Sequence, residues 1–363
     1  MKPFSALYFI KENASRCIAL MLMIFLSFGC YLGGLYVTNP LDNWKVPFSY
    51  YAVMRTPGAS ALDADYSRYQ AFRQEMEEHP DILVLEQGQS NSFPWTTVMG
   101  FEIGTFTLTF RSVEEFKIYC NYFGIECDFS GLSSGSLILS ERLAKNKGLE
   151  LGDVVDRNYS QQIYGTFTVN ALTNEAGYCQ YYIDDTPIEH PVLLLLPVNI
   201  STEEFHTFFN EAWDRNPVAI YNGLLQENVE REYKSFNLIY TFVVILLAVI
   251  LAVTINAAFV GMYQRRNFEF TVYRAIGISK RRIVGKIVSE LVCLDFVTLL
   301  LGGGIFFLAL YLLNNLVLYP AGKYLNYFHP LALTGLLLCN VTILVPLIVT
   351  RCRQLLRADI CEY

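Results

Sequence analysis

The sequence has little of what acid–base, nucleophilic or metal chemistry requires. Histidine occurs only four times in 363 residues. The four positions show neither the spacing of metal ligands nor the arrangement of a Ser/His/Asp or Cys/His site. They are His79, His190, His206 and His329. We therefore expect a non-catalytic chain with no bound metal and no cofactor.

A phosphate-binding loop is also absent. The pattern G-x-x-x-x-G-K-[ST] is not completed, because Ile287 follows Gly285-Lys286 and Tyr324 follows Gly322-Lys323. The chain thus lacks the usual cradle for the phosphates of ATP. Any ATP that its function requires should be bound by a partner subunit. Nothing in the sequence indicates a nucleic-acid partner.

Charged residues are scarce, at 17% of the sequence, whereas 53% of the residues are hydrophobic. That balance is too apolar for an ordinary soluble protein. Four windows reach the roughly 20 residues that cross a bilayer core. They are residues 17–37, 237–262, 287–319 and 330–350, and only the third contains charged residues. The sequence therefore predicts an integral membrane protein with four transmembrane helices.

The segments that flank these windows predict the orientation of the chain. Lys and Arg collect in cytoplasmic segments, and residues 263–286 carry seven basic residues against one acid. The N-terminal residues 1–16 and the C-terminal residues 351–363 have three basic residues each, while the loop 320–329 has only Lys323. We expect both termini in the cytoplasm and 320–329 as a short external loop.

The first window favours a membrane anchor over a cleaved signal peptide. Its apolar run exceeds the usual h-region of about 7 to 15 residues, and no A-x-A site follows it. Gly29 and Gly33 have the G-x-x-x-G spacing that permits close contact between helices. Such a contact could lie within the chain or at a dimer interface, and the sequence does not decide between them.

Residues 38–236 lie between the first two windows and should be extracytoplasmic. They hold 28 acidic and 13 basic residues, a net charge of 13 − 28 = −15, whereas the predicted cytoplasmic segments hold 13 basic and 4 acidic residues. An acidic domain outside and a basic side facing anionic lipid are what the membrane surface favours. Three of the nine cysteines fall in this domain. A disulfide between Cys120 and Cys127 is open, although three unpaired thiols, with Cys179, are the favoured interpretation.

The extracytoplasmic segment alternates helix and strand patterns, which predicts an α+β domain inserted between the first two transmembrane helices. Helix starts are predicted by the capping-box pairs Ser112 with Glu115 and Ser201 with Glu204. A further helix should cover residues 62–76. Strands are predicted at residues 82–85, 104–110, 137–139, 167–172 and 192–196.

Residues 224–264 contain no proline and predict one helix of about 60 Å. This length exceeds the bilayer core, so the first part of the helix should form an external stalk. By contrast, Pro40 and Pro47 argue against a similarly long helix after the first window.

The segment between the second and third windows predicts two short helical pieces joined by a turn. One apolar helical face combines Phe268, Val272, Ala275 and Ile276. Gly277 is placed to end that helix before the next one begins. By itself the segment could equally be a basic linker that lies on anionic lipid.

The same segment resembles a motif of the MacB/FtsX-type permeases of ABC transporters. The matching residues are Glu269, Arg274-Ala275-Ile276-Gly277 and Lys280-Arg281-Arg282-Ile283. A second motif of that family resembles Leu137-Ile-Leu-Ser-Glu-Arg-Leu-Ala144, Lys147-Gly-Leu-Glu-Leu-Gly-Asp-Val154 and Gly165-Thr-Phe-Thr-Val169. The chain departs from the family pattern at Asn170-Ala171, where Val-Gly is usual, and residues 38–87 show no match.

This resemblance implies a permease subunit in the bacterial cytoplasmic membrane. Such a subunit forms a dimer with a second copy or a homologue, contacts membrane lipid and binds cytoplasmic ABC ATPase subunits. ATP-driven motion would move the stalk and outside domain, a mechanotransmission mechanism, and so expel or extract an amphipathic peptide, lipid, lipoprotein or haem. The ATPase-coupling residues would be Glu269, Arg274, Ala275, Gly277, Lys280 and Arg281.

Two other functions stay open. An FtsX-like protein could signal to a cell-wall hydrolase, and a resistance sensor could act with a histidine kinase. The large outside domain favours transport. Within the third window, Glu290 and Asp295 would be costly in lipid. Structural pairing is favoured over proton handling for Glu290, and no role is assigned to Asp295.

Overall fold

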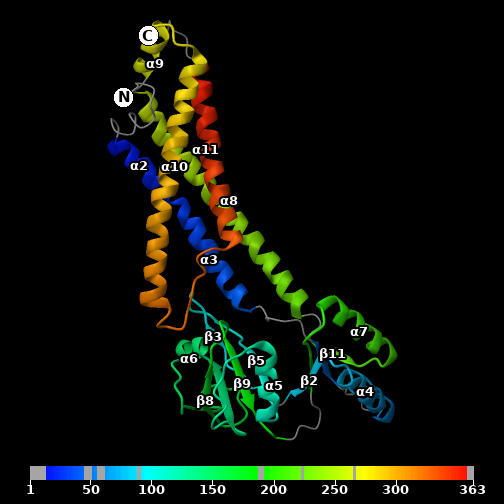
Figure 1. The fold of residues 1–363 in the computed structure, drawn as a ribbon. Coiled ribbons are helices and arrows are strands. Elements are labelled where there is room, and N and C mark those ends of the chain that lie inside the picture. The colour runs from blue at the N-terminus through cyan, green and yellow to red at the C-terminus, as the bar shows by residue number, and fades with distance from the viewer. Residues whose placement is uncertain are drawn as a thin grey trace. The chain divides into compact units, whose positions relative to one another are not determined.

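The computed structural model of the chain describes residues 14–44, 51–54, 62–87, 91–186, 192–221, 225–264 and 267–357. The chain divides into two compact units (Figure 1). The helical unit comprises residues 1–38, 235–315 and 325–363. The mixed unit comprises residues 39–234 and 316–324.

Long apolar helices build the helical unit. They are α2 (Ala14–Phe25), the first part of α3 (Ser27–Trp44), most of α8 (Leu225–Gln264), α9 (Asn267–Ala275), α10 (Lys280–Leu313) and α11 (Pro330–Arg357), with a short π-helical segment η1 (Asn314–Leu318) following α10. Among the described residues, three helical stretches are long and apolar enough to cross a membrane. They are Asn237–Ala257, Lys280–Leu318 and Pro330–Arg353. Three of the four predicted spans therefore coincide with such helices.

The first predicted span is a broken helix. α2 and α3 meet at Leu26, and the amide of Gly29 donates to the carbonyl of Leu26, only three residues back, at 2.9 Å. Neither helix is among the three that could span a membrane. α3 passes Pro40 and ends at Trp44, before Pro47, so the described residues show no helix after the first window as long as α8, as expected. Proline has a helical φ, and so close to a helix end it removes only one backbone hydrogen bond.

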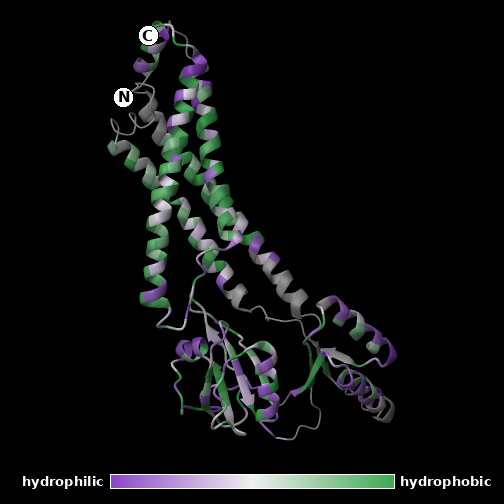
Figure 2. Ribbon diagram, in the orientation of Figure 1, coloured by the Kyte–Doolittle hydropathy of each residue, from purple (hydrophilic) through white to green (hydrophobic). Residues whose placement is uncertain are grey.

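Each long helix buries one stripe and exposes apolar side chains elsewhere. The buried stripe of α8 carries Tyr240, Val244 and Ala248 at a spacing of four, whereas Phe242 and Leu246 are exposed. Figure 2 shows hydrophobic residues on α8, α10 and α11 over most of their length. A helix that is apolar on all sides needs apolar surroundings, so these exposed faces indicate contact with lipid.

Two glycines let α3, α8 and α11 approach one another closely. The hydroxyl of Tyr240 in α8 donates to the carbonyl of Cys30 in α3 at 2.8 Å. A Cβ at Gly34 of α3 or at Gly335 of α11 would lie closer than 3.0 Å to that hydroxyl. The absence of side chains at these two positions thus makes room for Tyr240 in the core of the unit.

The mixed unit contains two main β-sheets. The first is antiparallel, in the order β11 (Ala219–Tyr221), β1 (Tyr51–Met54), β10 (Val192–Pro197) and β2 (Ile82–Gln87). The second has the order β5 (Phe106–Phe110), β9 (Cys179–Ile183), β6 (Ser136–Ser140), β8 (Phe167–Thr173) and β7 (Val154–Val155), with parallel pairs β5–β9 and β6–β8. A short hairpin, β3 (Trp95–Thr96) and β4 (Glu102–Ile103), pairs separately.

Four helices cover these sheets: α4 (Leu62–Glu77), α5 (Val113–Phe123), α6 (Glu141–Lys147) and α7 (Thr202–Arg215). α4 and α7 share a core with the first sheet, in which Phe72 and Phe209 meet edge to face at 5.7 Å. α5 and α6 contribute to two different cores of the second sheet, so every residue of β6 is buried. Leu85 and Leu194 of the first sheet join the core of α5, which ties the two sheets together.

The expected α+β domain is present, and each predicted strand coincides with an observed one. Ser201 and Glu204 form the predicted capping box. At Ser112 the prediction is half right. The Ser112 hydroxyl accepts from the amide of Glu115 at 3.2 Å, but the Glu115 carboxylate accepts from the amide of Arg111. α8 is one unbroken helix, as predicted.

The three cysteines of the mixed unit are free thiols. Cys120 and Cys179 are buried, and Cys127 is partly buried. Burial, reinforced by the charge of Asp128, raises the pKa of Cys127 to about 11. The thiol is therefore protonated at neutral pH and a poor nucleophile. The structure agrees with three unpaired thiols rather than with a Cys120–Cys127 disulfide.

We expect Phe116→Ala to destabilise the mixed unit by about 3 to 5 kcal/mol, because Phe116 is fully buried between α5 and the second sheet. Ile118→Ala is the matched control on the same helix, since its side chain is 46% exposed, and should change stability by less than about 0.5 kcal/mol. All three tryptophans lie in the mixed unit. Tryptophan fluorescence during denaturant unfolding of the detergent-purified chain measures both effects. Equal destabilisation by the two variants would contradict the assigned core.

Candidate coupling site

α9 is a nine-residue helix that ends in a tight turn before α10. At the turn, Gly277 has a φ of +86°, a conformation that costs glycine little and other residues more. Its amide donates to the carbonyl of Arg274 at 3.0 Å, and the amide of Ile278 donates to the carbonyl of Tyr273 at 3.0 Å. Ser279 then caps α10 in an extended conformation, without a side-chain hydrogen bond. The predicted helix stop and start are confirmed.

α9 presents one face to the core of the helical unit and another to its surface. Phe270 is buried in the same cluster as Ile283 and Ile287 of α10. On the other side, Val272 is 41% exposed and Ile276, just past the helix end, is 68% exposed. The chain thus leaves a small apolar surface uncovered at this end of α9.

Lys286 joins α9 to α10 from inside the unit. Its ammonium nitrogen lies 3.2 Å from Glu269 Oε1, 3.2 Å from the Tyr273 hydroxyl and 4.0 Å from Glu290 Oε1. It also lies 4.7 Å from the centre of the Tyr273 ring. The Tyr273 hydroxyl donates to Glu269 at 2.8 Å. One cation therefore contacts two groups of α9 and one of its own helix.

Burial makes these contacts strong determinants of the helix arrangement. The side chain of Lys286 is 3% exposed and that of Glu290 is fully buried, whereas that of Glu269 is 38% exposed. A charge inside a protein is costly unless it is paired and hydrogen-bonded. Separating α9 from α10 would remove two partners of the ammonium group, so the two helices should move as one body.

The predicted coupling residues fall into two groups. Glu269 takes part in the Lys286 network, and Arg274 is partly buried in the last turn of α9, where a cation complements the helix dipole. Ala275, Gly277, Lys280 and Arg281 are exposed. The second group, rather than the first, is available to another protein.

Sequence reasoning missed Lys286 and Tyr273. Lys286 entered it only as one of the basic residues that set the orientation of the chain. The signal that could have found it is the spacing of four between Lys286 and Glu290, which puts opposite charges on one face of an apolar helix. Tyr273 lies four residues after Glu269 and meets it in the same way.

The two acids of the third span differ in their surroundings. Glu290 has the ammonium group of Lys286 within 4.0 Å, which is the structural pairing favoured from the sequence. Asp295 is partly exposed and lies opposite the amide side chain of Asn340 on α11. A neutral amide is a weaker partner for a carboxylate than a cation.

Gly29 and Gly33 make no close contact inside the described part of the chain. A Cβ at either position would meet nothing within 4 Å. The neighbouring Gly34 supplies the close approach to α8 and α11 instead. The described residues therefore show no helix packing within the chain at Gly29 and Gly33. Their role at a dimer interface stays a prediction.

Arg351 connects α11 to α8 within the helical unit. Its side chain is buried, although the sequence suggested a cytoplasmic tail residue. One guanidinium nitrogen lies 2.9 Å from the carbonyl oxygen and 3.0 Å from the side-chain oxygen of Asn256 in α8. Arg351 therefore holds the end of α11 against α8. In the described ranges, no group of three His, Cys, Asp or Glu side chains is placed to hold a metal ion.

The segment that contains this site is similar to a known protein family. Residues 240–353, which include α9, α10 and most of α11, match the family model described as FtsX-like permease C-terminal. No curated protein matches the chain. One matching crystal structure is a domain of a protein from Porphyromonas gingivalis described as a permease, 14% identical, covering 46% of this chain and 82% of that chain with a TM-score of 0.26. A TM-score this low does not establish a common fold. The family match includes residues 269–283 and confirms the resemblance to FtsX-type permeases that this motif carries, whereas the second motif, at residues 137–169, lies outside the matched segment.

We expect Lys286→Met to destabilise the helical unit by about 3 to 5 kcal/mol, because it removes the cation that lies 4.0 Å from the buried Glu290 carboxylate. The double variant Lys286→Met with Glu290→Leu should regain most of that stability, since it removes both charges. Lys280→Met, at an exposed position on the same helix, is the control and should have little effect. Loss of the helical circular-dichroism signal during denaturation in detergent measures all three. A double variant no more stable than the single one would show that the ion pair is not what matters.

Proposed function

Residues 240–353 of this chain match the family model of the FtsX-like permease C-terminal domain, and on that premise we propose that the protein is the membrane subunit of an ABC transporter. A separate cytoplasmic ATPase subunit supplies the energy of ATP hydrolysis. The permease passes the resulting motion to its large α+β domain. The substrate is an amphipathic molecule, such as a peptide, lipid, lipoprotein or haem, that is expelled or extracted outside the membrane.

One observation carries this proposal: a short helix that is rigidly fixed to a long apolar helix and uncovered on its other side. A subunit that moves the permease needs a surface to grip and a rigid connection behind it. Val272, Ala275 and Ile276 provide an exposed apolar surface, which is typical of a protein contact when charged residues surround it. Lys280 and Arg281 are the neighbouring cations. The Lys286 network provides the rigid connection.

The distribution of charge supports a bacterial cytoplasmic membrane topology with both termini inside. We propose that α2 and α3 together form the first of four spans and that residues 38–236 are extracytoplasmic. The 13 basic and 4 acidic residues assigned to the cytoplasmic side, against 13 and 28 outside, follow the positive-inside rule. The short helix then lies on the side where an ATPase and its ATP are present.

A dimer with a second copy or a homologue completes the proposal. Gly29 and Gly33 have open space where a Cβ would be, and small residues at this spacing let another helix approach closely. Within the dimer, each copy would offer one α9 to one ATPase subunit. The arrangement transmits force through helices and does not require a channel for the substrate.

Charge reversal and polar substitution on the exposed surface test the coupling role. We expect Ile276→Glu and Arg281→Glu to reduce co-purification of the ABC ATPase, and its stimulation, by about tenfold or more, as is usual for central residues of a contact. Ile276 is largely exposed, so its replacement should leave the fold intact. Arg353→Glu reverses an exposed charge on α11 instead and should retain the ATPase. Wild-type levels of bound and stimulated ATPase with Ile276→Glu would refute the assignment, as would a wild-type chain that retains no ABC ATPase.

Cysteine labelling tests the proposed topology. In a cysteine-free background, Glu150→Cys should react with a membrane-impermeant maleimide on intact cells, whereas Lys280→Cys should react only after permeabilisation. Both positions are exposed on the surface of the protein, so lack of reaction reports membrane protection rather than burial. The opposite labelling pattern would reverse the orientation.

A further inference from the structure

A short segment between the last two apolar helices belongs to the mixed unit. Residues 316–324 pack with residues 39–234, although residues 315 and 325, their neighbours in the chain, belong to the helical unit. From the sequence, this region was expected to be the end of a span and part of a short external loop. Its contacts within the mixed unit are instead close and specific.

Gly322 is the point at which the segment meets α6. A Cβ at this position would lie closer than 3.0 Å to the backbone nitrogen of Asn146 and to the backbone oxygen of Arg142. Gly322 also has a φ of +61°, which disfavours any other residue. Because the neighbouring atoms are backbone atoms of a helix, they cannot turn aside to accept a side chain. The segment is therefore seated directly on the backbone of α6.

Aromatic and charged side chains hold the segment in this position. The buried hydroxyl of Tyr178 donates to the carbonyl of Gly322 at 2.9 Å. Burial raises the pKa of Tyr178 to about 12, so the hydroxyl keeps its proton at physiological pH. The guanidinium of Arg142 lies over the ring of Tyr178 at 5.8 Å and over the ring of Tyr324 at 5.6 Å. Tyr324 also stacks on Tyr319 at 5.3 Å.

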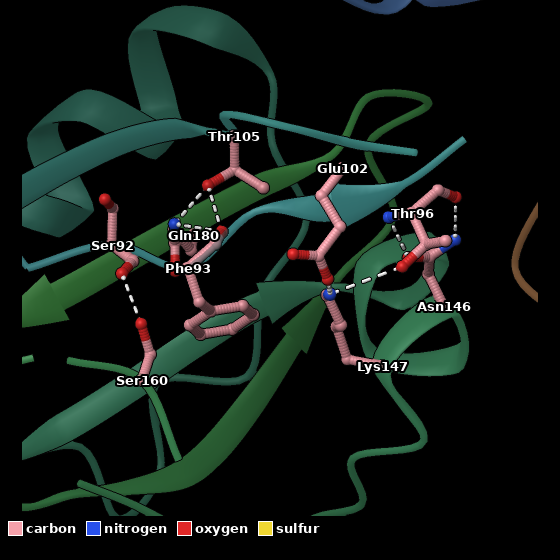
Figure 3. Close-up of polar contacts among 9 residues, drawn as sticks. All are labelled: Ser92, Phe93, Thr96, Glu102, Thr105, Asn146, Lys147, Ser160 and Gln180. Carbon is pink, nitrogen blue, oxygen red and sulfur yellow. Dashed lines mark hydrogen bonds and ion pairs between the residues drawn. The ribbon is translucent and has the colours of Figure 1, made fainter. Parts of the chain in front are cut away.

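α6 also holds the β3–β4 hairpin (Figure 3). The side-chain amide of Asn146 accepts from the amide of Thr96 at 2.8 Å and donates to its carbonyl at 2.9 Å. Lys147 forms an ion pair with Glu102 of β4 at 2.7 Å. Trp95 of the hairpin stacks on Tyr178, with 4.0 Å between the rings. Tyr178 and Asn146 thus contact both the segment 316–324 and the hairpin.

A buried glutamine fixes the base of this hairpin to the second sheet. The side-chain nitrogen of Gln180 in β9 donates to the carbonyl of Phe93 at 3.2 Å (Figure 3) and to the hydroxyl of Thr107 at 2.8 Å. The hairpin therefore has one attachment to the sheet and one to α6. A displacement of α6 would strain the hairpin against the sheet.

We propose that residues 316–324 are a second mechanical tether of the mixed unit, through which movement of α10 and α11 reaches α6 and the β3–β4 hairpin. This tether acts in addition to α8. The seating of the segment on α6 is independent of the transport function, whereas its role in transmitting motion rests on the proposed function.

Hydrogen–deuterium exchange of the full chain in lipid nanodiscs tests the seating. We expect Gly322→Ala to raise the exchange rate of residues 316–324 by about tenfold or more, because exchange follows the free energy of local opening. Gly148→Ala is the matched control: its φ is +64°, yet a Cβ there would meet nothing within 4 Å. Exchange in 316–324 should stay unchanged in this control. Unchanged exchange with Gly322→Ala, or an equal rise with Gly148→Ala, would overturn the seating. Tyr178→Phe, which deletes one hydrogen bond, should give a smaller rise.

The same measurement with the ATPase and ATP present tests transmission. In the wild type we expect ATP to change the exchange of residues 95–103, and Gly322→Ala should abolish that change. An ATP-dependent change that persists with Gly322→Ala would overturn the tether as the route. If ATP does not change exchange in the wild type, the proposed function and the transmission role are both overturned. The contact of residues 316–324 with α6 is tested separately, by their exchange rate without ATP.

Discussion

The position of α9 depends on one buried ammonium group. Lys286 lies in the second turn of α10, and Glu269 and Tyr273 on α9 are close polar partners of its ammonium group. The turn at Gly277 by itself would allow a range of angles between the helices, because glycine restricts the backbone least. The buried cation selects one of them, since its ion pair with Glu269 and its hydrogen bond to Tyr273 form only when α9 lies close to α10. The uncovered apolar surface is therefore presented in one orientation.

The two units achieve rigidity by different physical means. In the helical unit, the Lys286 network pairs charges among apolar helices, where a mispaired charge carries a large cost. In the mixed unit, α6 adds steric contact and neutral hydrogen bonds to its Lys147–Glu102 ion pair: Gly322 lies on its backbone, and Asn146 pairs with both backbone groups of Thr96. Steric contacts of this kind do not depend on pH or salt, whereas the outer part of the Lys286 network, where Glu269 reaches the surface, is open to screening.

The regular parts of the fold could be predicted from the sequence because they follow simple patterns. Apolar length located three spans, and the alternation of strands and capped helices gave the α+β domain. The break between α2 and α3 lies at Leu26-Ser27 inside an otherwise apolar window, so apolar length alone did not reveal it. β9 was missed since its residues are buried at every position and include Cys179, Gln180 and two tyrosines, so neither alternation nor an aliphatic run marks it.

The candidate site was predictable in outline and not in its contacts. The resemblance of residues 269–283 to a family motif located α9 and its turn, but it treated Glu269 as a surface contact. Only the three-dimensional arrangement shows that Glu269 turns inward to Lys286, 17 residues later. Likewise, the hydrogen bond between Tyr178 and Gly322 joins two positions 144 residues apart. No local sequence pattern encodes such a contact.

The division of the chain also affects how the α+β domain can be handled and exchanged. The chain passes between the two units four times, after residues 38, 234, 315 and 324. A fragment cut at the first two of these boundaries would contain every strand yet lack nine residues of its own fold, leaving the Tyr178 hydroxyl and the backbone of α6 open to water. For the same reason, recombination between related genes cannot replace this domain as a single cassette. A compatible α6 and a compatible segment 316–324 have to be inherited together, although they lie far apart in the gene.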